Sequence, residues 1–345
     1  MTQSAENNRR FLGLNRFWAW PDELRQSGIL GINNRNVSFI QTNNPRRLYP
    51  RVDDKLLTKR ICQEHDIPVP DTYGTLTTHG DVKQFNKKLG HLREFVAKPA
   101  NGAAGRGIVV VADRVEDSFF TSGGREIRWS DFRYHLSTMI SGLYSLGGQE
   151  DVVIVERRIV SHPTMMRLGT EGTPDIRVIV YRGVPAMAMI RLPTEQSSGK
   201  ANLHQGAVAA AIDLATGRTF GGVSANRAIT HHPDTGNPIA GIEIPSWREL
   251  LDAAMRLSDA LEMGYVGIDF VIDAQTGPVV LEANARPGLA IQLAHRQGIL
   301  PRLRHIDALS PSQRIGDRRW EHIPGLSSEP PEVDDSDDGA LRILA

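Results

Sequence analysis

The chain has 345 residues, and its 40 basic and 40 acidic side chains give a formal net charge of zero. A balanced charge provides no overall field for nucleic acid or a membrane surface, and no apolar run is long enough for a transmembrane helix. The single cysteine, Cys62, excludes a disulfide framework and indicates a reducing compartment. The N-terminus lacks the apolar core of a signal peptide, so we expect a cytoplasmic protein.

Residues 1–50 are expected to form a short N-terminal unit. Asparagine and arginine crowd the stretch 33–36, which predicts a polar loop. The loop is either a plain turn or a set of donors for a carboxylate substrate. After it, Val52 to Asp66 predicts a helix capped by Asp53 or Asp54.

Two lysines, Lys55 and Lys59, lie one turn apart on this helix. Lysines in such positions usually face solvent, and the sequence alone assigns them no other role.

A glycine-rich loop follows the short strand that ends at Lys98. It holds Gly102, Gly105 and Gly107 and leads into a β-branched apolar strand. P-loops and dinucleotide-binding loops need a helix after the glycines, so both are excluded. Strand, glycines and strand instead predict a flap whose backbone N–H groups can close over phosphates, with Lys98 as a point charge beside them. The alternative is an ordinary hairpin.

The segment 113–150 is polar and less regular, and a helix is predicted near 129–141. An apolar strand from Asp151 then runs to Glu156. Such a strand exit suits a hinge that binds an adenine edge, although an ordinary strand end is an equally good interpretation.

The stretch 173–182 alternates between apolar and polar residues and places Asp175 and Arg177 on one face. It is predicted to form a hairpin with 185–190, and Arg191 lies at the exit of that hairpin. The next loop carries Lys200, Asn202 and His204. A lone loop histidine is more often structural than catalytic.

A helix is predicted over residues 247–263, with Ser246 and Glu249 forming a capping box at its start. It leads into the strongest signal of the chain, a predicted β-hairpin over residues 264–288. If Gln275 and Thr276 form its tip, Asp269 lies opposite Glu282, and Asn284 shares the face of Glu282.

Carboxylates that face each other across a strand pair repel, and a divalent cation would offset this repulsion. Two carboxylates and an amide oxygen, with positions left for water and phosphate oxygens, suit Mg²⁺. The metal ligands predicted in this way are Asp269, Glu282 and Asn284. The alternative is an exposed hairpin edge with scattered acids.

The order of these elements resembles the ATP-grasp superfamily, and most closely its ribosomal-protein glutamate ligase group of α-L-glutamate ligase-like proteins. The resemblance covers residues from about 53 to 301. The matching motifs are Asp54-Lys55 with Ile67-Pro-Val-Pro70, Lys98 with the flap, Val155-Glu156-Arg157, Asp175-Ile-Arg177, Asn202-Leu-His-Gln-Gly206, and Asp269 with Glu282-Ala-Asn284 and Pro287-Gly288.

The resemblance implies an α+β, ATP-grasp fold of two lobes closing on ATP, and a ligase that joins a carboxylate to an amine through an acyl phosphate. It implies two Mg²⁺ ions, with Mn²⁺ as an alternative, held by the three predicted metal ligands. The implied nucleotide-binding residues are Lys55, Lys98, Gly102, Gly105, Gly107, Glu156, Arg157, Asp175, Lys200 and Asn202. Arg177, Arg191 and Lys200 are the implied catalytic residues.

Several features depart from the resemblance and leave the acceptor open. The N-terminal unit is about half the usual length, and the segment 113–150 looks like an insertion. Lys200 stands where the glutamate ligases tend to carry arginine, and Arg286 where they carry a small residue. Arg286 is either a surface residue or a ligand of a substrate carboxylate.

The predicted organisation is an N-terminal unit (1–50), a small lobe (51–155), a large lobe (156–325) and an acidic, disordered tail (326–345). The expected substrates are ATP and an amino acid, glutamate-like, added to an amine, peptide or protein. Neither nucleic acid nor membrane insertion is expected, and a homo-oligomer is left open. The alternative function is a non-catalytic ATP-binding partner or sensor, against which the complete set of lysine and metal ligands argues.

Overall fold

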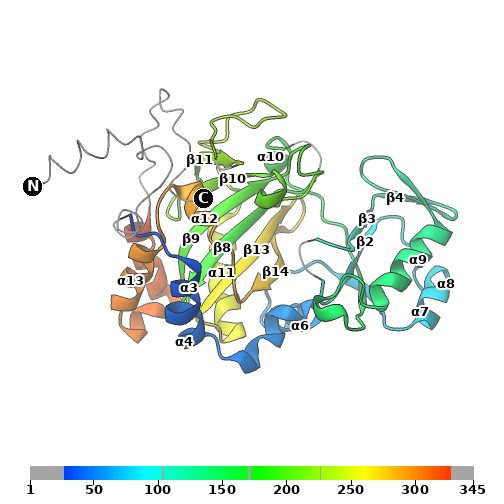
Figure 1. Cartoon of the computed structure of the whole chain (residues 1–345), viewed down its shortest axis with the longest axis horizontal. Helices are drawn as coiled ribbons and strands as arrows, with labels where there is room; N and C mark the ends of the chain where they lie inside the picture. Colours follow the sequence, from blue (N-terminus) through cyan, green and yellow to red (C-terminus); the bar gives the residue numbers. More distant parts are fainter. Residues whose placement is uncertain (1–26, 103–104, 170–171, 226, 328–345) are drawn as a thin grey trace, which may run out of the picture.

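The structure is a computed structural model that describes residues 27–102, 105–169, 172–225 and 227–327. The chain forms two lobes beside each other (Figure 1). The larger lobe is built on a seven-stranded sheet, and the smaller one holds a four-stranded and a three-stranded sheet. All strand pairs of the described residues are antiparallel. Helices combined with such sheets confirm the predicted α+β class.

The seven-stranded sheet has the order β12-β11-β10-β9-β8-β13-β14. Its strands are β8 (Asp175–Tyr181), β9 (Val184–Leu192), β10 (Val208–Ile212), β11 (Thr219–Ser224), β12 (Arg227–Ala228), β13 (Tyr265–Asp273) and β14 (Gly277–Asn284). Both predicted hairpins, β8–β9 and β13–β14, are present. The first turns at Arg182 and Gly183, which both have positive φ, as a tight two-residue hairpin requires.

Helix α11 (Trp247–Leu261) packs on β8, β9, β13 and β14 through a buried apolar face. The predicted capping box is wrong: Ser246 has φ of 52° and its side chain caps no N–H group. The shorter helices of this lobe are α10 (Pro163–Met166), α12 (Ile291–His295) and α13 (Leu300–Ala308), followed by 3-10 turns at Pro311–Arg314, Gly316–His322 and Pro324–Leu326. A further 3-10 turn covers Leu203–Gln205.

The four-stranded sheet of the smaller lobe has the order β1-β7-β2-β3. Its strands are β1 (Thr72–Leu76), β2 (Phe95–Pro99), β3 (Val109–Val111) and β7 (Val153–Glu156), and the helices α7 (His79–Lys83) and α8 (Phe85–Leu89) lie between β1 and β2 in the chain. The predicted succession of strand, glycines and strand is therefore confirmed as β2, loop and β3. The loop comes back antiparallel onto the strand it left.

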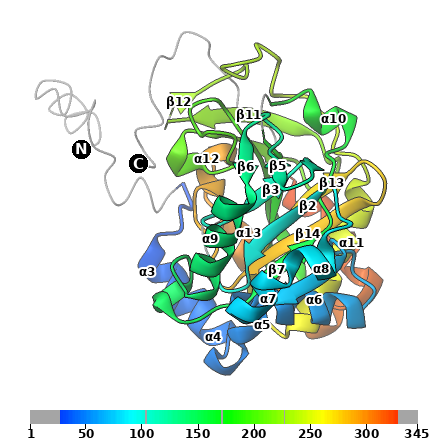
Figure 2. The ribbon, with the colours of Figure 1, turned by 90° about the vertical axis from the view of Figure 1, so that its right-hand side faces the viewer.

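The segment predicted as an insertion holds β4 (Asp113–Val115), β5 (Ser118–Phe120), β6 (Glu126–Arg128) and α9 (Trp129–Ile140), and a short 3-10 turn follows at Leu146–Gly148. It contributes Phe119 and Phe132 to the core of the smaller lobe, and their ring centroids are 4.5 Å apart. Phe85 and Phe95 pack against them. The segment is thus part of this lobe's core. Figure 2 shows α9 running beside the sheets.

The N-terminal part of the described chain is helical, so the loop predicted at 33–36 is wrong. It holds α3 (Ile32–Asn34), a π-helical turn (Arg35–Ile40), α4 (Gln41–Asn43), a 3-10 turn (Arg46–Leu48) and α5 (Pro50–Asp53). Phe39 and Leu48 are buried in the core of the larger lobe. The apolar residues of this segment override the turn preference of its asparagines.

Helix α6 (Lys55–Glu64) starts at Asp54, whose carboxylate accepts from the N–H groups of Leu56 and Leu57. Of the two predicted caps, Asp54 is therefore the one used. The backbone N–H of Val280 on β14 donates to the carbonyl of Pro68, which lies between α6 and β1. The predicted acidic tail lies, from residue 328 on, outside the described residues.

None of the helices in the described ranges has the length and apolarity that a crossing of a bilayer requires. The domain boundaries stay a prediction.

Candidate active site

The β13–β14 hairpin places the predicted metal ligands on one face. Asp269 lies opposite Glu282, and Gly267 lies opposite Asn284. Asp269 is 2% exposed, whereas Glu282 is half-buried. Asn284 Nδ2 donates to Glu282 Oε1 at 3.3 Å. The geometry thus brings two carboxylates and an amide together, as the register argument predicts.

The two predicted catalytic arginines hold Asp269 from the other side. Arg177, its neighbour on β8, donates from Nε to Oδ1 at 2.7 Å and from Nη2 to Oδ2 at 2.6 Å. Arg191 on β9 donates from Nη2 to Oδ2 at 2.9 Å. Arg191 also binds Asp175, with Nε 2.5 Å from Oδ1. Basic and acidic side chains therefore alternate across the sheet, in the order Arg177, Asp269, Arg191 and Asp175.

Burial and charge oppose each other in this network. Burial raises the pKa of Asp269, but Arg177 and Arg191 outweigh it and hold that pKa well below its ordinary value. Burial dominates at Asp175 and raises its pKa to about 7, against the attraction of Arg191. Asp269 is the charged anchor of both guanidinium groups. The predicted place of Asp175 near a ribose stays a prediction.

A second cluster lies at the exit of β7, around Glu156. Lys98 Nζ lies 2.5 Å from Glu156 Oε1, and Lys59 Nζ donates to Oε2 of the same carboxylate. All three side chains are buried, at 8% exposure or less. The expectation that Lys59 faces solvent is therefore wrong. The sequence shows the spacing of Lys55 and Lys59, but it gives no sign of Glu156, the carboxylate that Lys59 contacts.

Lys55 links the lysine cluster to the hairpin. Its Nζ donates to the carbonyl of Gly102 at 2.5 Å. Burial lowers the pKa of Lys55, and the charge of Glu282 opposes that shift. Glu282 is therefore near enough to act on Lys55. Lys55 therefore lies between the flap and the hairpin, with contacts to Gly102 on one side and the charge of Glu282 on the other.

The flap is anchored at both ends by residues that sequence analysis did not single out. At its start, the buried Asp151 accepts from the backbone N–H of Asn101 at 3.1 Å and from Ser145 Oγ at 2.5 Å. At its end, Gly107 has φ of 78°, and His135 Nε2 lies 2.9 Å from its carbonyl oxygen. A Cβ on Gly107 would stand 2.7 Å from the ring of Tyr144.

Three predicted site residues have other surroundings. Arg157 reaches the hairpin turn, with Nη1 3.0 Å from Asp273 Oδ2, so its side chain connects the lobes there. Lys200 is exposed. Asn202 caps the following 3-10 turn through the N–H of His204. Their predicted contacts with nucleotide stay predictions.

Arg286 is exposed, and its guanidinium lies 5.2 Å from the ring centroid of Tyr49. Gly102 lies at the start of the flap and Gly105 within it. Gly105 has φ of 67°, and a Cβ added there would meet no atom within 4 Å.

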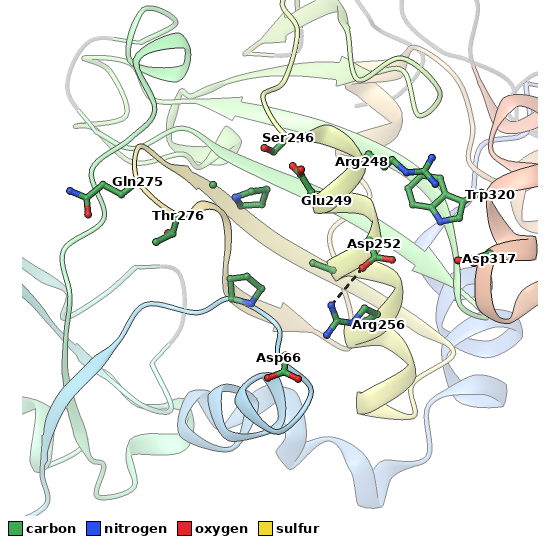
Figure 3. Close-up of a pocket in the computed structure, with 14 residues that line it drawn as sticks. Asp66, Ser246, Arg248, Glu249, Asp252, Arg256, Gln275, Thr276, Asp317 and Trp320 are labelled. Atoms are coloured by element: carbon green, nitrogen blue, oxygen red, sulfur yellow. Dashed lines mark ion pairs between the residues drawn. The ribbon is translucent and has the colours of Figure 1, made fainter.

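A hollow of about 370 Å³ adjoins the flap anchor and is lined by Asp53, Asn101, Ser145, Gln149 and Glu150. A larger one, of about 700 Å³, lies elsewhere: between the first turns of α11, the hairpin turn and Trp320 (Figure 3). There Arg248 stacks on Trp320, and Arg256 faces Asp252. It contains none of the predicted site residues, so we place the candidate active site at the hairpin and the lysines.

The residues around Asp269 and Glu282 fit Mg²⁺. Asp269 accepts three hydrogen bonds from the arginines, which leaves about one of the roughly four acceptor sites of a carboxylate. A cation there would take the amide oxygen of Asn284 in place of its nitrogen. No group of three or more His, Cys, Asp or Glu side chains in the described ranges is arranged for a metal. Water and phosphate oxygens would complete the shell of such an ion.

Antiparallel sheets in two lobes, a flap between β2 and β3, and facing carboxylates on a hairpin define an ATP-grasp protein. The chain belongs to the sugar-transfer associated ATP-grasp family, whose profile matches residues 34–308. The superfamily expected from the motifs is thereby confirmed. No curated protein matches the chain.

Solved structures of ATP-grasp proteins are similar to the chain at low identity. The ATP-grasp ligase PsnB with its minimal precursor is 15% identical, with 77% of this chain and 63% of PsnB covered and a TM-score of 0.42. D-alanine–D-alanine ligase from Bacillus anthracis is 18% identical (81% and 69% covered, TM-score 0.39). A RimK domain ATP-grasp protein from Sphaerobacter thermophilus is 14% identical (76% and 70% covered, TM-score 0.40). The chain spans less than two thirds of PsnB.

Proposed function

We propose that the protein is an ATP-dependent carboxylate–amine ligase that forms an amide bond through an acyl phosphate. The observation that carries the proposal is the pairing of Asp269 on β13. It lies opposite Glu282 on β14 and, on its other side, opposite Arg177 on β8. A buried and a half-buried carboxylate that face each other beside cationic groups are suited to a metal–phosphate complex. Family membership supports the same class of site.

Phosphoryl transfer to a carboxylate brings two anions together, so the site must supply positive charge. Lys55 on α6 and Lys98 on β2 would bind phosphate oxygens, under the backbone N–H groups of the flap. Arg177 and Arg191 would hold Asp269 in place and face the reacting carboxylate. Mg²⁺ held by Asp269, Glu282 and Asn284 would neutralise phosphate charge and orient the γ-phosphoryl group.

In the proposed reaction, an oxygen of the substrate carboxylate attacks the γ-phosphorus and ADP leaves with the electron pair of the broken P–O bond. The amine nitrogen of the acceptor then attacks the acyl carbon. Phosphate leaves from that carbon, and the amine loses a proton to solvent. The products are an amide, ADP and phosphate. The amine attacks in its unprotonated form, and the reaction written in this way assigns no protein group as an acid or base. His204 is exposed in the 3-10 turn Leu203–Gln205.

The carboxylate substrate is proposed to be a glutamate-like amino acid and the acceptor an amine, a peptide or a protein. The family's description associates it with sugar transfer, so amino sugars belong among the acceptors to be tested. PsnB was solved with a precursor peptide, and peptides are a second acceptor class.

The test is release of ADP and phosphate from Mg²⁺-ATP, with amino acids, short peptides and amino sugars offered in pairs. We expect release that requires one carboxylate and one amine, together with a product whose mass equals their sum less water. Glu282→Gln should lose this activity. Glu64→Gln removes an exposed carboxylate of α6 and should keep it. ATP hydrolysis without an amide product would contradict the proposal.

The second candidate function is a non-catalytic ATP sensor, favoured by the contact between Glu156 and Lys98, which engages a predicted phosphate ligand. A sensor would bind Mg²⁺-ATP with no turnover on any substrate pair, and Glu282→Gln would alter binding alone.

A further inference from the structure

The carboxylate of Glu156 is shared by two lysines from different elements. Lys98 comes from β2 and lies 2.5 Å from Oε1, while Lys59 comes from α6 and donates to Oε2. The exposed fractions of the three side chains are 8% for Lys59, 7% for Lys98 and 4% for Glu156. The cluster thus holds one more positive charge than negative charge in a place with little water.

A buried carboxylate that loses its last partner is strongly destabilising. The proposed function assigns Lys98 to the phosphates of ATP, and the structure places it in contact with Glu156. If Lys98 were the sole partner of Glu156, its transfer to phosphate would leave a buried charge unpaired. Lys59 on the other oxygen removes this obstacle, because Glu156 stays paired after Lys98 leaves.

We propose that Lys59 is a positioning residue for nucleotide binding, which retains Glu156 when Lys98 turns to the phosphates of ATP. This inference rests on the proposed function, since it needs Lys98 as a phosphate ligand. Lys59 itself stays with Glu156 and does not touch the nucleotide. Repulsion between the two ammonium groups favours the same exchange, because it is relieved when Lys98 moves away.

The electrostatics of the cluster support this division of roles. Burial alone raises the pKa of Glu156, but Lys98 and Lys59 hold it below its ordinary value, so the carboxylate is charged. Burial lowers the pKa of Lys59, and Glu156 opposes that shift. Lys59 and Glu156 each favour the charged form of the other.

The experiment measures the dissociation constant of the full chain for a non-hydrolysable ATP analogue with Mg²⁺, by calorimetry. We expect Lys59→Met to weaken binding about tenfold or more, because Glu156 then competes for Lys98. Lys59→Arg keeps a charged donor and should bind within about threefold of the wild type. Arg60→Met removes an exposed charge from the same helix and should leave binding unchanged.

A double-mutant cycle separates this role from a general attraction between Lys59 and phosphate. In a Glu156→Gln background no charge retains Lys98, so adding Lys59→Met should change affinity less than twofold. An equal loss in both backgrounds would overturn the inference, since it would mean that Lys59 acts on the nucleotide directly.

Two further outcomes are decisive. Unchanged affinity in Lys59→Met, in a protein whose thermal unfolding is cooperative, would overturn the inference and leave the proposed function standing. Failure of the wild type to bind the analogue would overturn the proposed function and the inference together.

Discussion

Asp269 and Glu282 lie opposite each other on one rung of the β13–β14 hairpin, but their surroundings differ. Asp269 is buried and held by the guanidinium groups of Arg177 and Arg191, whereas Glu282 is half-buried and its charge acts on Lys55 of α6. One carboxylate therefore belongs to the internal charge network of the sheet, and the other is partly exposed beside a lysine. Replacing Asp269 with asparagine should therefore affect stability, whereas replacing Glu282 with glutamine should affect metal binding.

Asp269→Asn should destabilise the fold. It removes the negative charge between two nearly buried guanidinium groups, and breaking a buried ion pair from one side costs about 3–5 kcal/mol. We expect a lower free energy of unfolding in urea with an unchanged slope. Asp252→Asn, on the outer side of α11, should change it by about 0.5 kcal/mol or less. Equal stabilities of Asp269→Asn and the wild type would contradict this account of the network.

Glu282→Gln should keep the fold and lose the metal. Its side chain is half-buried, and an amide fills the same space. We expect unfolding free energy within about 1 kcal/mol of the wild type, and a Mg²⁺ titration of nucleotide binding that loses its steep dependence. Persistence of the wild-type Mg²⁺ dependence in this variant would show that the metal site lies elsewhere.

The pairing at the metal ligands could be predicted from the sequence, but the bulge on which this pairing depends could not. Placing the tip at Gln275-Thr276 pairs Asp269 with Glu282, and the structure has that pair. Near the tip, however, Asp273 pairs with Gly277, one residue out of that register, and a bulge between Asp269 and Phe270 restores it. Bulges depend on tertiary packing, so a strand pattern cannot reveal them.

The sequence could not predict contacts between distant elements. Lys59 has the pattern of a helix lysine that faces solvent, but in the structure it contacts Glu156 on β7. The asparagines and the arginine of residues 33–36 favour a loop. The segment is nevertheless helical, because Phe39 and Ile40 pack in the core of the larger lobe. The motifs could be recognised from neighbouring residues in the sequence. The partners of their side chains depend on how the two lobes pack.

Gly107→Ala should weaken nucleotide binding through the flap. The substitution meets the ring of Tyr144 at 2.7 Å and adds strain at a φ of 78°. Gly124→Ala is the matched control, because its φ of 76° is nearly the same but open space surrounds it. Strain alone costs about 1–2 kcal/mol of stability in either variant. We expect about a tenfold weaker affinity for the ATP analogue in Gly107→Ala alone, and equal affinities of the two variants would contradict a role of Tyr144 in shaping the flap.

The buried His295 should make the larger lobe sensitive to acid. It lies in contact with the ring of Phe220, with Nε2 2.7 Å from the carbonyl oxygen of Ala188. Burial, and then the charge of Arg302, lower its pKa to about 3, against the opposing effects of the hydrogen bond with Ala188 and the charge of Asp213. The folded protein thus keeps His295 neutral at pH values where the unfolded chain protonates it.

The sign of the pH effect follows from proton linkage. Between about pH 6.5 and pH 3 the unfolded state binds one more proton at His295 than the folded state does. Stability attributable to this residue is therefore complete above pH 6.5 and falls with decreasing pH, by at most about 1.4 kcal/mol per pH unit. His295→Gln keeps an N–H donor for Ala188 but has no such proton. Urea unfolding of both proteins from pH 8 to pH 4 should give a stability difference that is constant above pH 7 and shifts in favour of the variant below pH 6. Parallel curves over the whole range would show that His295 does not titrate on unfolding as this burial requires.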